Sequence, residues 1–350
     1  MKSKSNHGSS MRAEVSKDRI IRDLRNLGVN EGDHIAVALS LKSIGYVKGG
    51  PEAFIDALLE AVGSNGTIMM NTFTLTFPLS EIAYDYVFDY KSTPGYTGLV
   101  PETLRKRRNS IRSLHPTLSV IAIGKLAKHL TEGHDEDSSP YMPYSRLAAA
   151  DGKYLCIGIG NNLVAIRHEA QRRAGLFNVV PKFFGVRYRD EEGKLNIFVW
   201  KYPPCVEKLP ELVPILRKMR IVKIGKIGMA HSILAPARKL IDAMTELLRN
   251  DPTLNLCDNI LCLWCRDFER RMNLYSKIEN PRFFQKSIFM IRIIALINRF
   301  RLKRYSFLSF RSGRGNEGRE NGRLRLFGSS FLGTLRVFYL IFRDKIRAVL

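Results

Sequence analysis

The sequence holds few acidic residues, few cysteines and no apolar segment near its start. Each of these features limits the kinds of protein that the sequence can encode. Of its 350 residues, 33 are acidic and 56 are basic, so the formal net charge is +23. Residues 1–16 are polar and lack the apolar stretch of a secretory signal, and we therefore expect a cytoplasmic protein. Hydrophobic residues make up 45% of the chain, which is enough for a globular protein with a large core.

The five cysteines are an odd number without the spacing of a disulfide framework, which agrees with a reducing compartment. Three of them, Cys257, Cys262 and Cys265, follow the pattern C-x4-C-x2-C. This spacing can bind zinc or an iron–sulfur cluster if a fourth ligand, such as Cys205, joins them. The residues between them are apolar, which is typical of thiols buried as small hydrophobic side chains. Burial is the commoner role, and a metal site is the alternative.

The basic charge is concentrated at the C-terminal end. Residues 281–350 contain 16 Lys and Arg against only Glu317, Glu320 and Asp344, so this segment holds +13 of the net charge. A strongly basic chain ordinarily indicates nucleic acid or an anionic membrane as a partner. Nucleic acid is the weaker candidate, because the segment has no recognisable binding module and its aromatic residues lie in apolar runs.

The same basic segment contains apolar stretches. Apolar residues recur at helical spacing in 287–300, and 326–342 is strongly apolar with basic residues at both ends. The latter stretch falls short of the ~20 apolar residues that a membrane-spanning helix needs. Two interpretations remain open: a basic amphipathic helix lying on an anionic membrane surface, or a helix docked on the rest of the chain or on a second subunit. The first would make the protein peripherally membrane-associated.

Helical and strand-like segments alternate in the first part of the chain. Ser16 is a suitable N-cap for a helix that stops at Gly28, and an amphipathic helix is expected at 52–62. The apolar runs at 34–41 and 66–70 have the length of buried strands. The order helix, strand, helix, strand predicts an α/β fold.

A polar cluster precedes another predicted strand within 112–124, which reads R-S-L-H-P-T-L-S-V-I-A-I-G. The polar side chains before the β-branched run 120–123 are Arg112, Ser113, His115 and Ser119. They are delivered to the end of a core strand, and Pro116 keeps His115 out of a helical conformation. A His-Pro turn of this kind is structural more often than catalytic, and the motif alone does not decide between these roles.

A series of short segments stands out along residues 16–255. The first five are S-L-K-S-I-G-Y-V-K-G-G, G-T-I-M-M-N-T-F-T, F-D-Y-K-S-T-P, R-S-L-H-P-T-L-S-V-I-A-I-G and S-S-P-Y. They are followed by R-H-E-A-Q-R-R-A-G and by K-I-G-K-I-G-M-A-H-S-I-L-A-P. In order and spacing, this series resembles the aminoglycoside 3-N-acetyltransferase family, whose histidine segment is similar to R-H-E-A-Q-R-R-A-G.

The resemblance implies a fold and a reaction. The family's fold is an α/β sandwich around a central mixed sheet flanked by helices. Its members are acyl-CoA-dependent enzymes that usually move acetyl from acetyl-CoA to an amine of an amino sugar. The amine must lose a proton to act as a nucleophile, and imidazole has the pKa range to accept that proton near neutrality. His168 matches the family's catalytic histidine, and His115 and Glu169 complete the predicted catalytic set.

The resemblance also implies a site for acetyl-CoA as cosubstrate, without a metal. Fixed donors must face the thioester oxygen as it gains negative charge, and we expect them among the backbone amides near Ser40 or Thr72. Arg112, Ser113 and Lys42 are the candidates to meet CoA phosphates or pantetheine amides. The full set of predicted cofactor-binding residues is Ser40, Lys42, Ser43, Thr72, Arg112, Ser113 and Ser119.

The sequence departs from the family pattern at the predicted site. The family's His-Ser-Ser run at the first strand end reads Ala-Leu-Ser at 38–40 in this chain, and the proline before the threonine of the second strand is Asn71. The glutamate expected three residues after the catalytic histidine is Gln171, and Val164 stands where an aspartate is expected. A histidine base normally has an acidic partner that holds its tautomer. The candidates for that partner are Glu169, Glu207 and Glu211.

We therefore expect a divergent member of the family. A modestly basic body suits polycationic aminoglycosides poorly because like charges repel, so a polysaccharide or nucleotide-sugar amine is an alternative acceptor. A catalytically weak member that binds a membrane or a protein partner is a further alternative. The predicted organisation is a disordered N-terminus at 1–15, an acyl-CoA-dependent N-acetyltransferase domain at 16–280 and a basic helical C-terminal extension at 281–350.

Overall fold

The structure is a computed structural model that describes residues 14–79, 86–163, 165–176, 184–199, 211–257, 262 and 265. All of these residues belong to one unit of the chain, Met1–Ile288. The predictions for 1–13 and for the extension at 281–350 lie outside the described residues, as do Val164, Cys205 and Glu207. In the described part of the chain, no helix combines the length and the apolar character needed to cross a bilayer.

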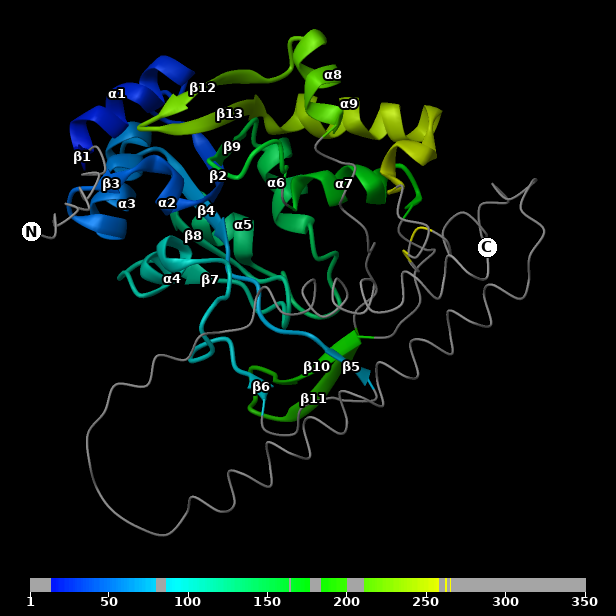
Figure 1. Cartoon of the computed structure of the whole chain (residues 1–350). Helices are drawn as coiled ribbons and strands as arrows, with labels where there is room; N and C mark the ends of the chain where they lie inside the picture. Colours follow the sequence, from blue (N-terminus) through cyan, green and yellow to red (C-terminus); the bar gives the residue numbers. More distant parts are fainter. Residues whose placement is uncertain are drawn as a thin grey trace, which may run out of the picture. The chain divides into compact units, whose positions relative to one another are not determined.

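A seven-stranded mixed sheet forms the centre of the described fold (Figure 1). Its strands, in spatial order, are β12 (Lys223–Ile227), β13 (Ala230–Pro236), β9 (Lys153–Ile157), β2 (His34–Leu39), β4 (Thr67–Asn71), β8 (Val120–Gly124) and β7 (Ile111–Arg112). β2 pairs in parallel with both β9 and β4, whereas the remaining neighbours pair antiparallel. The predicted α/β fold with a central mixed sheet is therefore confirmed.

Helices pack on both faces of this sheet. They are α1 (Lys17–Leu27), α2 (Leu41–Ile44), α3 (Gly50–Val62), α4 (Leu99–Arg105), α5 (Ala127–Thr131), α6 (Met142–Ala149), α7 (Ile166–Arg173), α8 (Leu212–Lys218) and α9 (Ala237–Asn250), with a 3-10 turn η4 (Pro252–Asn255) after α9. Alternate residues of a strand point to opposite faces. Ile35 and Val37 of β2 join the core that contains α1 and α3, whereas Ala36 and Ala38 join the core that contains α6, α7 and α9. β2 is apolar along most of its length because it is buried on both sides.

The predicted elements of the first part of the chain form close to their expected bounds. The Ser16 hydroxyl caps α1 by accepting a hydrogen bond from the Arg19 N–H at 3.3 Å. Gly28 ends this helix with a φ of 111°, a conformation that glycine adopts without strain. One boundary prediction is wrong: Glu14 and Val15, placed in the disordered N-terminus, form strand β1 (Glu14–Val15), which pairs in parallel with β3 (Tyr46–Val47).

A second, smaller sheet has four strands that the sequence did not predict. They are β5 (Phe77–Pro78), β6 (Val87–Phe88), β10 (Phe184–Arg189) and β11 (Leu195–Val199). β10 pairs antiparallel with β11 and β5 and in parallel with β6. Figure 1 shows this sheet set apart from the helices of the large one. It still contacts the polar stretch before β8, because the ring of Phe198 lies edge-on to that of His115 at a centroid distance of 5.1 Å.

Candidate active site

The carboxyl ends of three parallel strands meet at one edge of the central sheet. Their last residues are Ile157 in β9, Leu39 in β2 and Asn71 in β4. The antiparallel strand β8 begins at the same edge, where Val120 pairs with Asn71. Ligand sites of α/β proteins form outside the carboxyl ends of such strands. The predicted residues Ser40, Thr72 and Ser119 flank these strand ends and are therefore brought to the same edge.

Thr72 and Ser119 join β4 to β8 through three hydrogen bonds and a close contact between their hydroxyls. The Thr72 N–H and Oγ1 donate to the Ser119 carbonyl at 2.8 and 3.1 Å, and the two hydroxyls lie 3.0 Å apart. The Ser119 Oγ in turn donates to the Thr72 carbonyl at 2.9 Å. Both side chains are fully buried. Their polar groups hold the strand ends together, so we leave both residues out of the proposed cosubstrate contacts.

The Arg112 guanidinium binds the loops around this strand end. It donates to the Ser119 Oγ at 3.1 Å and to the carbonyls of Tyr90 at 3.2 Å, Thr72 at 3.2 Å and Thr93. It also lies over the Phe88 ring of the small sheet, 5.1 Å from the centroid. Burial lowers the pKa of Arg112 to about 10, and the nearby Arg105 adds to this effect. Because most of its donors are committed to protein oxygens, Arg112 positions the small sheet and the Tyr90–Thr93 loop rather than offering a free cation to a phosphate.

His115 is completely buried beside the same strand ends. Its Nδ1 accepts hydrogen bonds from the backbone amides of Thr117 and Leu118 at 3.3 and 3.1 Å, so Nε2 carries the ring proton. Its ring lies 5.0 Å from that of His134. Burial and the neighbouring His134 hold the pKa of His115 well below its ordinary value. Since its one lone pair is already used, the ring is a structural element of the turn, as the His-Pro motif more often is.

Ser113 and His134 form a buried polar bridge next to this turn. The Ser113 Oγ accepts from the Val120 N–H at 2.9 Å and lies 2.8 Å from His134 Nδ1. On the other side of the ring, Nε2 lies 3.0 Å from the Pro140 carbonyl, which can only accept, so Nε2 carries the proton. Burial lowers the pKa of His134 to about 3. Ser113 is thus committed to the fold, and we also leave it out of the proposed cosubstrate contacts.

His168 lies in the first turn of α7 and is only 8% exposed. Its Nδ1 hydrogen-bonds to the Oε1 of Gln171, one helical turn further on. Since a carbonyl oxygen only accepts, Nδ1 carries the proton and Nε2 keeps its lone pair. The ring stacks on Tyr141 at a centroid distance of 5.0 Å. Burial, and to a smaller extent the Arg167 guanidinium, lower the pKa of His168 to about 3, so the imidazole is neutral at neutral pH.

The segment Pro140 to Tyr144 connects His168 with the strand ends. Pro140 accepts the hydrogen bond from His134, and the next residue, Tyr141, stacks on His168. One turn later in α6, the Tyr144 hydroxyl donates to Asn71 Oδ1 at 2.6 Å. His168 and the polar edge of the sheet are therefore joined by a continuous chain of contacts. This segment contains the end of the S-S-P-Y motif, which explains why the motif accompanies the histidine segment.

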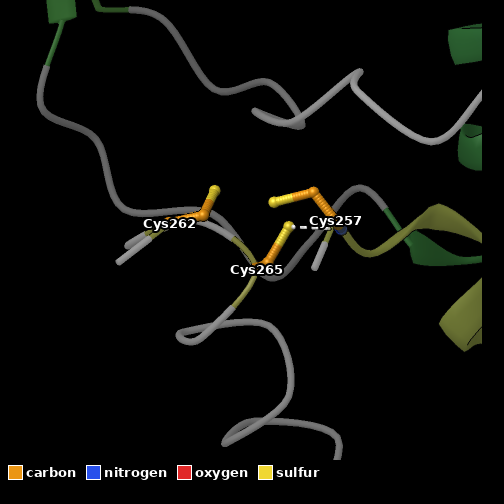
Figure 2. Close-up of side chains that lie close together, drawn as sticks. All are labelled: Cys257, Cys262 and Cys265. Carbon is orange, nitrogen blue, oxygen red and sulfur yellow. Dashed lines mark hydrogen bonds between the residues drawn. The ribbon is translucent and has the colours of Figure 1, made fainter. Parts of the chain in front are cut away.

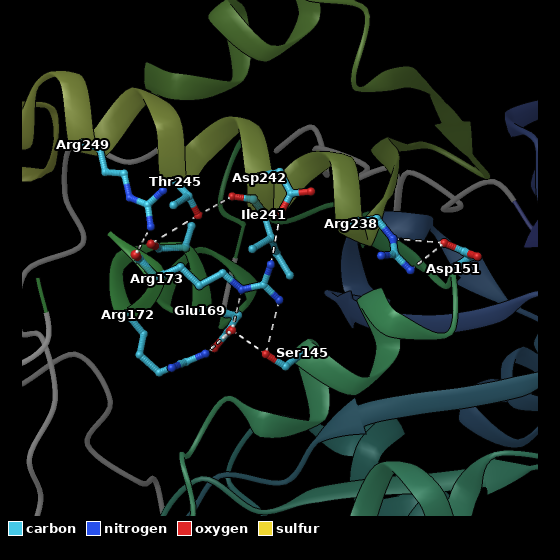
Figure 3. A network of polar contacts seen from close by, with 11 residues as sticks. Ser145, Asp151, Glu169, Arg172, Arg173, Arg238, Ile241, Asp242, Thr245 and Arg249 are labelled. Carbon is cyan, nitrogen blue, oxygen red and sulfur yellow. Dashed lines mark hydrogen bonds and ion pairs between the residues drawn. The ribbon is translucent and has the colours of Figure 1, made fainter. Parts of the chain in front are cut away.

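Glu169 is turned toward Ser145 of α6 and toward Arg172 and Arg173 of its own helix (Figure 3). Its carboxylate accepts from Arg172 Nε and Nη2, both at 2.8 Å, from Arg173 Nε at 2.9 Å and from the Ser145 hydroxyl of α6. Arg173 continues the network to Asp242 of α9 at 3.1 Å. Burial alone would raise the pKa of Glu169, but the hydrogen bonds from Arg172, Ser145 and Arg173 outweigh burial and lower it. Glu169 thus anchors the helix that holds His168.

Replacing Glu169 with glutamine is expected to lower the free energy of unfolding by about 1–3 kcal/mol at neutral pH, because charge-assisted hydrogen bonds to a buried carboxylate are lost. A lowered pKa means that this contribution is fully present above the unfolded-state value near 4.5 and fades as the pH falls through the folded-state value. Urea unfolding at pH 7 and at acid pH measures both effects. Glu246→Gln, at an exposed position of α9, is the matched control. Equal losses in the two variants would contradict this role.

Ser40, Lys42 and Ser43 lie at the end of β2 and in the short helix α2. The Ser43 Oγ donates to the Gly158 carbonyl at 2.9 Å and lies 3.0 Å from the Ser40 Oγ. Gly158 has a φ of +65°, and a Cβ there would lie 2.4 Å from the Ser43 Cβ, so glycine is required for this close approach. Ser40 is partly exposed and Lys42 is exposed. These two remain accessible to a ligand at the edge of the sheet.

Two of the backbone amides in the region of the expected oxyanion donors are already used by the sheet. The Ser40 N–H donates to the Ile157 carbonyl at 2.9 Å, and the Thr72 N–H donates to Ser119. Both amides continue the ladders of the central sheet and cannot also face a thioester oxygen.

Glu211 is another candidate for the acidic partner of His168, and it is exposed at the start of α8.

Comparison with known proteins identifies the family. A family model described as aminoglycoside 3-N-acetyltransferase matches residues 37–249, which span the central sheet from β2 to α9. The chain belongs to this family. The aminoglycoside N(3)-acetyltransferase VII of Streptomyces paromomycinus is 31% identical over 269 residues, which cover 65% of this chain and 89% of that protein. The aminoglycoside N(3)-acetyltransferase VIII of Streptomyces fradiae is 34% identical over 178 residues, but the match covers 46% of this chain and only 62% of the relative.

Solved aminoglycoside acetyltransferases share the fold. A histidine-to-alanine variant of aminoglycoside acetyltransferase AAC(3)-IVa in complex with a gentamicin superposes with a TM-score of 0.66 at 25% identity, over 75% of this chain and 99% of the other. AAC(3)-Xa superposes with a TM-score of 0.59, also at 25% identity, over 68% of this chain and 94% of the other. The chain is thus a divergent aminoglycoside 3-N-acetyltransferase-family member, as the motifs predicted.

Three residues of the site were not singled out from the sequence of this family member. Gln171 was noted only as a departure from an expected glutamate, although its position three residues after His168 on a helix predicts contact. Tyr141 belongs to the S-S-P-Y motif but was given no role there, and His134 had no signal of its own. Both connect segments through tertiary contacts, a ring stack and a hydrogen bond to a backbone carbonyl, which a sequence pattern does not encode.

Proposed function

We propose that this protein transfers acetyl from acetyl-CoA to an amine of a cationic amino sugar, with His168 as the general base. The observation that carries the proposal is the state of the His168 ring. Nδ1–H is held by Gln171, Nε2 keeps its lone pair, and Tyr141 fixes the plane of the ring beside the strand ends. The family and the names of the aminoglycoside-modifying relatives support the choice of reaction.

The low pKa of His168 shapes the proton path. An imidazole whose pKa is about 3 accepts a proton poorly and cannot store it. The amine therefore reacts as the free base, its ammonium proton having gone to water. Nε2 takes one of the remaining N–H protons as the nitrogen bonds to the acetyl carbonyl carbon, and passes it on as the carbon–sulfur bond breaks. The proton leaves on sulfur, so that the products are the amide and the free thiol of CoA. Gln171 is neutral and serves to orient the ring, without stabilising an imidazolium by charge.

The donor would approach the edge of the sheet at the end of β2. Lys42 is exposed beside the partly exposed Ser40, and an ammonium there can meet a CoA phosphate. Arg112, Ser113, Thr72 and Ser119 contribute by holding the strand ends and loops around that edge. In this proposal Ser40 and Lys42 contact the cosubstrate directly. The other four residues only position the edge, because their polar groups are bonded within the protein.

An acidic loop supports a cationic acceptor in spite of the basic net charge. Asp135, Glu136 and Asp137 directly follow His134 and precede the Pro140 to Tyr144 segment. Within the described part of the chain, none of the three forms an ion pair, and all are at least partly exposed. Glu136 accepts a hydrogen bond from the Tyr188 hydroxyl of β10 at 2.8 Å. These carboxylates place negative charge next to the Pro140 to Tyr144 segment in the chain, whereas the charge that acts directly on His168 is the Arg167 guanidinium. The acidic loop favours a polycationic amino sugar over a neutral or phosphorylated one.

Release of free thiol from acetyl-CoA, measured with a panel of amines, tests the proposed function. We expect release with aminoglycosides, weaker release with simple amino sugars and none with nucleotide-linked amino sugars, whose phosphates the acidic loop repels. Mass spectrometry of the acceptor should find one added acetyl group. Background thiol release with every amine would contradict the function, and preference for a nucleotide sugar would contradict the acceptor.

Replacing Gln171 with glutamate is expected to raise kcat by about tenfold or more, because a carboxylate partner stabilises the imidazolium that forms on His168. The same change should raise the pKa of His168, so that the acid limb of the kcat profile moves to higher pH. A merely structural effect would not move that limb. Gln171→Leu, which removes the Nδ1 partner, is the paired variant and should be slower than the unaltered protein. Unchanged profiles in both variants would remove Gln171 from the mechanism.

A further inference from the structure

Three cysteines that follow helix α9 in the sequence converge (Figure 2). Cys257, Cys262 and Cys265 follow α9 and η4 in the sequence, and their Sγ atoms all lie within 4.8 Å of one another. Cys257 and Cys265 are 3% and 1% exposed, whereas Cys262 is partly exposed. Figure 2 shows the three side chains arranged around a common space. Their convergence is a tertiary feature that the C-x4-C-x2-C spacing allows but does not require.

One of the sulfurs accepts a hydrogen bond from the backbone. The Cys257 N–H donates to Cys265 Sγ at 3.3 Å. A thiol sulfur is a weak acceptor, whereas a thiolate is strengthened as an acceptor by its charge. A donor directed at sulfur therefore lowers the cost of deprotonation, and it is the thiolate that binds metals. This contact favours metal binding over simple burial of thiols as hydrophobic side chains.

The distances select the type of metal centre. In a tetrahedral zinc site with zinc–sulfur bonds of about 2.3 Å, the sulfurs lie roughly 3.8 Å apart. Three sulfurs that are all within 4.8 Å of one another need only a small contraction to reach this geometry. An iron–sulfur cube holds its cysteine sulfurs farther apart, because each sulfur lies outside a different iron corner. The separation in this chain thus fits a single ion.

We propose that Cys257, Cys262 and Cys265 bind one zinc-class divalent cation as thiolates. Among the residues that the structure describes, no further His, Cys, Asp or Glu joins the group, so the fourth position belongs to water or to a ligand outside them. Cys257 and Cys265 lie in the same core as α7 and α9. The ion therefore fastens the chain that follows α9 to this core, and its role is structural and separate from the acetyl transfer.

Metal content of the full-length protein tests the site directly. After purification and dialysis against a small excess of zinc, followed by removal of loosely bound metal, elemental analysis should find about one zinc per chain. Each of the variants Cys257→Ser, Cys262→Ser and Cys265→Ser should lose at least nine-tenths of it. The matched control is Cys156→Ser in β9, a buried cysteine whose Sγ contacts the carbonyls of Gly160 and Asn162.

Cobalt substitution reports the ligand set and does not depend on activity. Apoprotein titrated with Co²⁺ should develop the thiolate charge-transfer and visible bands of a tetrahedral sulfur site. Cys262→Ser, whose side chain is partly exposed, is the variant that disturbs the core least, and it should weaken these bands while thermal unfolding stays cooperative. Zinc retained by all three variants, an apoprotein that binds no Co²⁺, or bound iron with inorganic sulfide would each overturn the proposal.

Discussion

Replacing His168 with alanine is expected to lower kcat for acetyl transfer by about 100- to 10,000-fold, the usual contribution of a positioned general base. The reason is that Gln171 accepts a hydrogen bond from Nδ1–H, which leaves the lone pair of the ring on Nε2 to accept the proton. The KM for acetyl-CoA should change little, because His168 is assigned to the amine and not to the cosubstrate. Thiol release under saturating acetyl-CoA measures both constants.

Two controls separate this effect from loss of fold. His168→Gln keeps most of the side-chain volume and should lose as much activity as the alanine variant, since an amide cannot accept the proton and pass it on. His129→Ala, at an exposed position of α5, should retain full activity. Circular dichroism and cooperative unfolding confirm that the variants are folded. Rates equal to those of the unaltered protein in either His168 variant would remove this residue as the base.

The protein is expected to lose about 5 kcal/mol of unfolding free energy between pH 6.5 and pH 5, because three buried histidines resist protonation in the folded state. These are His115, His134 and His168, whose pKa values burial lowers, to about 3 for the latter two. A histidine with an ordinary pKa of about 6.5 gains its proton in the unfolded chain over this range. The folded protein does not, so the stability contributed by neutral burial is present above pH 6.5 and is lost as the pH falls.

Urea unfolding at a series of pH values measures this loss. Carboxylates contribute little to the change in stability between pH 6.5 and pH 5. Those with lowered pKa values, such as Glu102 and Glu169, are largely ionised in both the folded and the unfolded state over this range. A loss of this size is comparable with the whole stability of a typical domain. His134→Gln, which can keep the hydrogen bond to Pro140, should make the dependence less steep by about a third. A stability that is constant from pH 6.5 to pH 5 would show that these rings titrate normally.

The sequence predicted strands β2, β4 and β8 of the central sheet because their signals are local, whereas β7, β12 and β13 were not expected. Helix α1 has a serine cap and a glycine stop, and β2 and β4 are short apolar runs bounded by polar turns. The small sheet was missed because it has no comparable signal. β5 and β6 have two residues each and pair with β10, which follows them by about a hundred residues in sequence. Pairing over such separations is decided by tertiary packing rather than by local pattern.

The candidate site was predicted in outline but not in its chemistry. The family motifs pointed to His168 and the strand-end residues, and the structure joins them through the Pro140 to Tyr144 segment. Sequence reasoning could not tell which polar groups are committed to the fold. Ser113 and Ser119 look like ligand-binding hydroxyls in a motif, but both are used up by buried hydrogen bonds. Likewise Glu169, adjacent to His168 in sequence, faces α6 and α9 because neighbouring residues of a helix point in different directions.

The central claim is that His168 is a neutral base with its proton on Nδ1, held there by Gln171. Long-range nitrogen–proton NMR of the imidazole nitrogens, recorded as the pH is lowered from about 7.5 to about 5.5, tests this claim most directly. The account predicts a protonated Nδ1 and an unprotonated Nε2 throughout the titration, with His168→Gln identifying the signals by their disappearance. A ring that titrates near its ordinary pKa of about 6.5, or one that carries its proton on Nε2, would contradict it.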